Sequence, residues 1–316
     1  MYSRYPLIST TAFVFLALAV LGGCTGESPP DTSETAAESS VERGKYLVEA
    51  VMGCPACHTG EDQTGTPAFS ERYAGGLEVM DAFGLWRSLN ITQDIETGIG
   101  GWTDEEIIVA IREGLRPNGE RLFPIMPYPL YNRLSDVDAQ SIVDYLRTIP
   151  AVAKIVERAT DLTLPRTIPP PPTGEGPPEG DRVKLGEYIT SLMACVDCHT
   201  PLKAEGGYNE DRKFAGGFPM PTPPALGTGT IWSSNITPDE ETGIAHYSEE
   251  QIIAAITSMQ KADGSPIRGP MKFYRQGWSR VTQDDLQSVA AFLKSLPPIE
   301  NRVPEATFKP HPRPAE

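Results

Sequence analysis

The sequence predicts an all-α protein made of two tandem domains that a proline-rich linker joins. Three observations support this prediction. Six segments recur in the same order in two parts of the chain, signals for the start of a helix recur with them, and prolines gather between the two copies. No stretch shows the alternation of apolar and polar residues that marks a half-buried strand. Because only two copies of about 110 residues are present, we interpret them as a duplicated domain rather than a solenoid.

The composition limits the classes of protein to consider. The chain has 316 residues, of which 39% are hydrophobic, a fraction that is normal for a soluble protein and too low for a bundle of many membrane spans. It carries 27 basic and 42 acidic side chains, which gives a net charge of −15. This excess of acid argues against nucleic acid as a partner and predicts protein partners with basic docking patches. Five cysteines cannot all pair, which argues against a disulfide scaffold.

Residues 1–23 have the features of an export signal. One base, Arg4, precedes an apolar run over residues 11–21 that is too short to span a bilayer comfortably, and two glycines and Cys24 follow. This pattern resembles a bacterial lipoprotein signal, in which Cys24 becomes the acylated first residue of the mature chain. An ordinary secretory signal and an uncleaved membrane helix are the alternatives. We therefore expect a protein that lipid holds at the periplasmic face of a bacterial membrane.

Three further segments lack the apolar periodicity that a buried core requires. Residues 24–40 are rich in Ser, Thr, Ala, Glu and Pro, and we expect a flexible tether there. Residues 154–181 include a run of four prolines at 169–172, which predicts a stiff, extended linker. Residues 301–316 form a second proline-rich segment, which we interpret as a tail.

The repeats place the first domain at residues 41–153 and the second at residues 182–300. Each is expected to contain at least three helices joined by long loops rich in Gly and Pro. An N-cap Ser or Thr followed by acids in the first turn marks four of the expected helices. In chain order the expected helices are residues 41–52, 103–113, 135–149, 183–193, 249–259 and 282–296.

The pentapeptide Cys-x-x-Cys-His stands at the equivalent position of each copy. It comprises Cys54, Cys57 and His58 in the first copy and Cys195, Cys198 and His199 in the second. Two cysteines on one helical turn can form thioethers with the two vinyl groups of a haem, and the adjacent histidine can then bind the iron. The sequence therefore predicts two covalently bound haems c. A zinc site would need the four cysteines of both copies to converge, and a thioredoxin-like dithiol would need a βαβ context.

The second axial ligand of each iron is expected later in each copy. Met126 and Met271 both follow a proline-containing segment just before the last helix of their copy, so they occupy corresponding places. A Met in such a segment is not part of a helical core stripe, which favours a role as ligand. Met259, at the end of a helix, and His246 are the rival candidates in the second copy.

These motifs together resemble the cytochrome c subunits of bacterial membrane-bound alcohol, gluconate and aldehyde dehydrogenases, which are built from tandem class I cytochrome c domains. The resemblance rests on Cys-x-x-Cys-His-Thr, Ala-Gly-Gly, Asn-Ile-Thr with Thr-Gly-Ile, and Met-Pro-Tyr in the first copy. It implies that His58 and His199 are the proximal ligands and Met126 and Met271 the distal ones. The chain departs from these subunits in having two haem motifs where three are typical, and in reading Met-Lys-Phe in the second copy.

The expected function is one-electron transfer between a dehydrogenase or respiratory complex and a terminal acceptor. With both axial positions of each iron filled, neither haem could bind a substrate without losing a ligand. The partners would be redox proteins, with the membrane reached through lipid and no nucleic acid involved. The alternative is a dihaem enzyme, a peroxidase or a thiosulfate-oxidising protein, which needs one iron with an open or displaceable ligand position.

Overall fold

The computed structural model describes residues 40–61, 67–81, 83–158, 162–163, 168–221, 227–267 and 269–310. The predicted export signal over residues 1–23, Cys24 and almost all of the predicted tether lie outside these ranges. Within them, no helix combines the length and the apolar character that crossing a membrane would require.

The described chain is rich in helices, and all six helices predicted from the sequence lie within two residues of their expected bounds. The first runs over residues 40–51, and its last part, Leu47–Val51 (η1), is π-helical. The other predicted helices are α3 (Asp104–Glu113), α5 (Asp136–Arg147), α6 (Arg182–Leu192), α8 (Glu249–Thr257) and α10 (Gln283–Ser295). Four short helices join them, namely α2 (Cys54–His58), α4 (Tyr128–Tyr131), α7 (Cys195–Cys198) and α9 (Met271–Trp278). Two single-turn 3₁₀ helices cover Phe69–Glu71 (η2) and Glu210–Arg212 (η3).

The helix-start signals act as the sequence predicts. Thr103 and Ser248 each form a reciprocal capping box, in which the side chain accepts from the backbone N–H three residues later and that residue's side chain accepts in return. Ser135 and Thr282 accept in the same way from the third residue of α5 and α10. Each cap satisfies backbone donors that the first turn of a helix leaves unpaired.

The structure confirms the helix-rich character of the all-α prediction, and the described residues also include three small antiparallel sheets of two strands each. The pairs are β1 (Glu78–Asp81) with β2 (Gly84–Arg87), β3 (Pro219–Pro221) with β5 (Thr230–Trp232), and β4 (Gly227–Thr228) with β6 (Lys309–Pro310). Strands of two to four residues are too short to show alternation above the noise of a sequence. The described part of the fold is therefore helix-rich with three small sheets.

The first and last helices of each half cross closely because a glycine stands at the crossing. A Cβ on Gly44 would lie 1.8 Å from the carbonyl oxygen of Ser141 in α5, and one on Gly186 would lie 1.9 Å from that of Ser288 in α10. Any larger residue would force the two helices apart. The repeated Gly-x-Tyr segment thus has a packing role that is the same in both halves.

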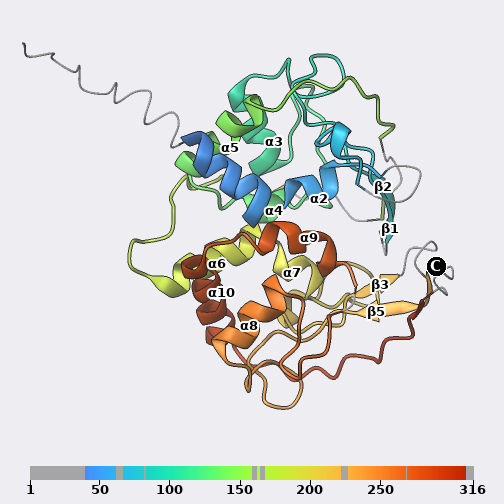
Figure 1. Cartoon of the computed structure of the whole chain (residues 1–316), viewed down its shortest axis with the longest axis vertical. Coiled ribbons are helices and arrows are strands. Elements are labelled where there is room, and N and C mark those ends of the chain that lie inside the picture. The colour runs from blue at the N-terminus through green and yellow to red at the C-terminus, as the bar shows by residue number, and fades with distance from the viewer. Residues whose placement is uncertain are drawn as a thin grey trace, which may run out of the picture.

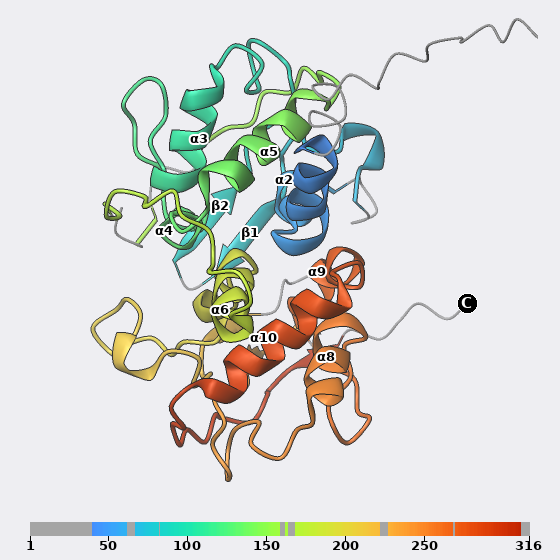
Figure 2. The ribbon, with the colours of Figure 1, turned by 90° about the vertical axis from the view of Figure 1, so that its left-hand side faces the viewer.

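The two halves of the chain lie one above the other, with the first half blue to green and the second yellow to red (Figure 1). Turned by 90°, the same view shows α6, α9 and α10 of the second half beneath the first helix and α4 of the first (Figure 2). One hydrophobic cluster includes buried side chains of both halves, among them Val51 and Tyr131 with Met193 and Trp278. The halves are therefore packed on each other through a shared core.

Candidate haem sites

Each Cys-x-x-Cys-His motif lies on a short helix that a left-handed residue starts. Gly53 (φ 62°) precedes α2, and Ala194 (φ 54°) precedes α7. The left-handed conformation turns the chain sharply between the preceding helix and the motif. It is strained for Ala194, because a Cβ disfavours this region. The two cysteines and the histidine of each motif line a cavity that both motifs share.

Both motif histidines are held in one orientation by a backbone carbonyl. Nδ1 of His58 lies 2.7 Å from the carbonyl oxygen of Leu89, and Nδ1 of His199 lies 2.7 Å from that of Ser234. Burial lowers the pKa of each histidine, which favours the neutral ring. A neutral ring that donates from Nδ1 to a carbonyl leaves the lone pair of Nε2 for a metal.

The Asn-Ile-Thr segments hold these carbonyls in place. Asn90 follows Leu89, and its Nδ2 donates to the carbonyl oxygen of Val152 (2.8 Å). Asn235 follows Ser234 in the same way and donates to the carbonyl oxygen of Ile299 (2.7 Å). Sequence reasoning found the repeat of this motif but not its role, which only the fold reveals. The available signal was the repeat of Asn-Ile-Thr itself, whose Asn and Thr side chains are buried in both halves.

A single cavity of about 970 Å³ brings together all eight haem residues predicted from the sequence. They are Cys54, Cys57, His58, Met126, Cys195, Cys198, His199 and Met271. The walls come from both halves, so the two motifs open into one space. The rival candidates Met259 and His246 do not line this cavity, and Met259 is buried in the core.

The two predicted methionines sit in different local structures. Met126 lies in a turn before α4, where its N–H donates to the carbonyl oxygen of Phe123 (3.2 Å). Met271 was expected in a loop, but it is the first residue of α9. The reason is Pro270, whose φ of −63° suits the start of a helix. Both methionines nevertheless line the cavity.

The thiols of the motifs are not activated for redox exchange. Burial raises the pKa of Cys54 and of Cys195 to about 12, so both thiols are protonated at neutral pH. A catalytic dithiol depends on a lowered thiol pKa, so this environment does not suit the thioredoxin-like alternative. Across the described residues, the histidines, cysteines and acids form no group of three or more that could hold a metal ion, as the zinc alternative requires.

The two motifs differ in charge. The second motif carries Asp197 between its cysteines, where the first has Ala56. Burial, followed by the charge of Glu210, raises the pKa of Asp197 to about 7. The second motif thus has an additional acid at the cavity wall.

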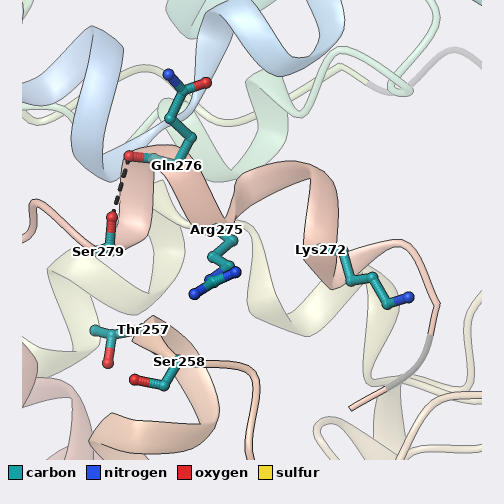
Figure 3. Close-up of a pocket in the computed structure, with 6 residues that line it drawn as sticks. All are labelled: Thr257, Ser258, Lys272, Arg275, Gln276 and Ser279. Carbon is teal, nitrogen blue, oxygen red and sulfur yellow. Dashed lines mark hydrogen bonds between the residues drawn. The ribbon is translucent and has the colours of Figure 1, made fainter. Parts of the chain in front are cut away.

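A second hollow, of about 590 Å³, lies between α9 and the C-terminal end of α8 and contains none of the predicted haem residues (Figure 3). Its lining is polar and comprises Thr257, Ser258, Lys272, Arg275, Gln276 and Ser279. Arg275 points toward Thr257 and Ser258, and the Ser279 hydroxyl donates to the carbonyl oxygen of Gln276 (3.3 Å). Two basic side chains therefore gather on the helix that carries Met271, in a chain that is acidic overall.

Comparison with known proteins finds relatives of this chain among c-type cytochromes. The cytochrome c subunit of the quinone-dependent alcohol dehydrogenase of Gluconobacter oxydans is 30% identical over 292 residues, which cover 84% of this chain and 57% of that subunit. The gluconate 2-dehydrogenase cytochrome c subunit of Pantoea cypripedii is 27% identical, over 83% of this chain and 61% of its own length. A protein named diheme cytochrome c-type from Cereibacter sphaeroides is 28% identical, over 90% of this chain and 97% of its own length. No protein-family model matches the chain.

The predicted resemblance is confirmed: the chain is a homologue of cytochrome c subunits of bacterial alcohol, fructose and gluconate dehydrogenases and of a diheme cytochrome c. The chain spans 57% to 64% of the length of the cytochrome subunits of the alcohol, fructose and gluconate dehydrogenases. The names of these relatives imply covalently bound haem c as the cofactor.

Proposed function

We propose that this protein is a membrane-anchored dihaem c-type cytochrome that carries single electrons between a dehydrogenase or respiratory complex and a terminal acceptor. One observation carries the proposal. Each of two Cys-x-x-Cys-His motifs presents a carbonyl-oriented histidine to a cavity that also contains a methionine of the same half. The redox partners are proposed to carry basic docking patches, which an acidic chain would attract.

The residues present fit one haem c at each motif. Cys54 and Cys57 would hold the first by thioethers, with His58 and Met126 as axial ligands. The second set is Cys195, Cys198, His199 and Met271. A haem with His and Met ligands supplies a one-electron centre whose potential is raised by the methionine. The chain's own contribution is to fix the ligands and to exclude water from the cavity.

We propose that the two halves are tandem class I cytochrome c domains over residues 41–153 and 182–300. The parallel placement of helices, caps and histidine-binding carbonyls in both halves supports this division. Residues 154–181 would be the linker and residues 301–316 the tail. Part of the linker packs on the first half, since the Asn132 side chain donates to the carbonyl oxygen of Pro170 (2.8 Å).

Electron exchange with a basic partner should depend strongly on salt. The net charge of −15 should attract a reduced soluble cytochrome c with a basic haem edge, used as a probe. Salt shortens the Debye length from about 30 Å at 0.01 M to about 3 Å at 1 M. We therefore expect the second-order rate constant, measured by stopped flow, to fall by about tenfold or more over this range.

An acidic soluble cytochrome provides the matched control, because repulsion should make its rate rise with salt. Absence of electron exchange with either probe would contradict the proposed carrier function. Exchange that is indifferent to salt with both probes would contradict the proposed basic docking patches of the partners.

The lipid anchor is proposed from residues 1–24, which lie outside the described part of the chain. Acylation of Cys24 would hold the protein at the periplasmic face of the membrane. We expect Cys24→Ser to release the protein into the soluble fraction or to block its processing, as fractionation and mass spectrometry of protein from a Gram-negative host would show. Unmodified Cys24 in soluble wild-type protein would contradict the anchor.

A further inference from the structure

The two halves meet through contacts that the repeat makes equivalent. In the second half, the Tyr188 hydroxyl in α6 donates to Asp138 Oδ2 in α5 of the first half (2.6 Å). The same hydroxyl accepts from the backbone N–H of Ser135, the N-cap of α5 (3.3 Å). A tyrosine of one half thus binds the N-terminal turn of the last helix in the other half.

The reverse contact is made by Tyr46, which is the counterpart of Tyr188 in the repeat. Its hydroxyl donates to Asp285 and accepts from the backbone N–H of Thr282, the N-cap of α10 (3.2 Å). Each half thus binds the first turn of the other half's last helix through the same tyrosine of the repeat. Such a reciprocal contact is the arrangement of a two-fold interface. It joins the two helices that lead into the motifs to the last helix of the opposite half.

Helix α9 is brought onto the first half by this interface. Gly277 lies so close that a Cβ there would be 2.6 Å from the carbonyl oxygen of Glu49. Nε1 of Trp278 donates to the carbonyl oxygen of Val51 (3.2 Å). Arg280 forms an ion pair with Glu49 (3.2 Å). The helix that starts with a predicted ligand of the second motif therefore packs on the helix that leads into the first motif.

Tyr274 in α9 reaches the first motif directly. Its hydroxyl lies 3.5 Å from Sγ of Cys57. Its ring lies so close to Gly53 that a Cβ on that residue would be 2.9 Å from the ring carbon Cδ1. The ring stacks on Trp278, with centroids 4.8 Å apart and planes at 15°. Sγ of Cys57 here stands for the thioether sulfur of the haem-loaded chain.

We propose that Tyr274 is a positioning residue that the second half contributes to the first haem site, so that the first site is complete only when the halves are docked. The inference rests on the proposed dihaem function. The tyrosine ring covers the Cys57 side of the cavity, and its hydroxyl can donate to the sulfur. Removal of the ring would admit water, and exposure to solvent favours the oxidised, more highly charged state of a haem.

The test is a spectroelectrochemical titration of the full, haem-loaded chain. The titration should show one redox wave for each haem. Met126→His identifies the wave of the first site, because replacement of a Met ligand by His lowers the potential of that site. We expect Tyr274→Ala to lower the reduced-to-oxidised ratio of the first site by about threefold at a fixed potential. This change corresponds to about 28 mV, since tenfold is 59 mV for one electron. Tyr274→Phe, which keeps the stacked ring, should move the same wave by less.

Phe273→Ala is the matched control, because Phe273 is the neighbouring aromatic residue of α9 and its side chain is 56% exposed. It should move neither wave. The proposal is overturned if Tyr274→Ala moves only the second wave or neither of them. If Tyr274→Ala does not assemble, Tyr274→Phe decides by whether it moves the first wave. Denaturing mass spectrometry of each variant counts the bound haems. A wild-type chain with fewer than two haems would contradict the proposed dihaem function, whereas the shift of the first wave tests only the role of Tyr274.

Discussion

Met126→Ala and Met271→Ala should each abolish about half of the weak near-infrared absorption band that arises from sulfur bound to ferric haem. Both methionines line the cavity that contains the two motif histidines, whereas the rival Met259 does not. Loss of the sulfur ligand should also lower the potential of the affected haem, because methionine ligation raises it. Absorption spectroscopy of the oxidised protein measures the band, and the titration described above measures the potential.

Met259→Ala is the control for these variants. Met259 is 5% exposed and packs in the hydrophobic core, so its removal should cost about 2–5 kcal/mol of folding free energy but leave the band intact. A band that survives Met271→Ala and falls in His246→Ala would show that the ligand of the second site has been assigned incorrectly.

The wild-type protein should turn over neither hydrogen peroxide nor thiosulfate. A haem enzyme of either kind needs an iron with an open or displaceable ligand position, and a methionine lines the cavity in each half. Met126→Ala and Met271→Ala would open one position each, so any turnover should arise only in these variants. Steady-state assays with each substrate measure this difference. Rapid turnover by the wild type that neither substitution changes would favour the dihaem enzyme over the carrier.

Much of the helical fold could be predicted because its signals are local. The cap at Thr103 needs only a hydroxyl and an acid three residues later, and the motif at Cys54 needs only five residues. The three small sheets were missed because their strands are shorter than the window in which alternation can be recognised. Met271 starts α9 rather than lying in a loop, because a proline can either interrupt a helix or precede its first turn, and Pro270 does the latter.

The rest of the candidate site depends on contacts that no local pattern encodes. The carbonyl oxygens of Leu89 and Ser234 orient the two histidines, but a backbone carbonyl is present whatever side chain stands at the position. The contact of Tyr274 with Cys57 joins residues that are 217 positions apart. Periodicity shows which face of a helix is apolar but not which partner covers it. The shared cavity therefore emerges only from the packing of the two halves.

The central claim is that the chain carries two covalent haems, and denaturing mass spectrometry of the intact protein tests it most directly. The protein would be produced with a cytochrome c maturation system and unfolded before measurement, so that only thioether-linked cofactor remains. We expect a mass gain of two haems for the wild type, and of one haem when Cys195→Ala and Cys198→Ala are combined. A wild-type gain of one haem or none would contradict it.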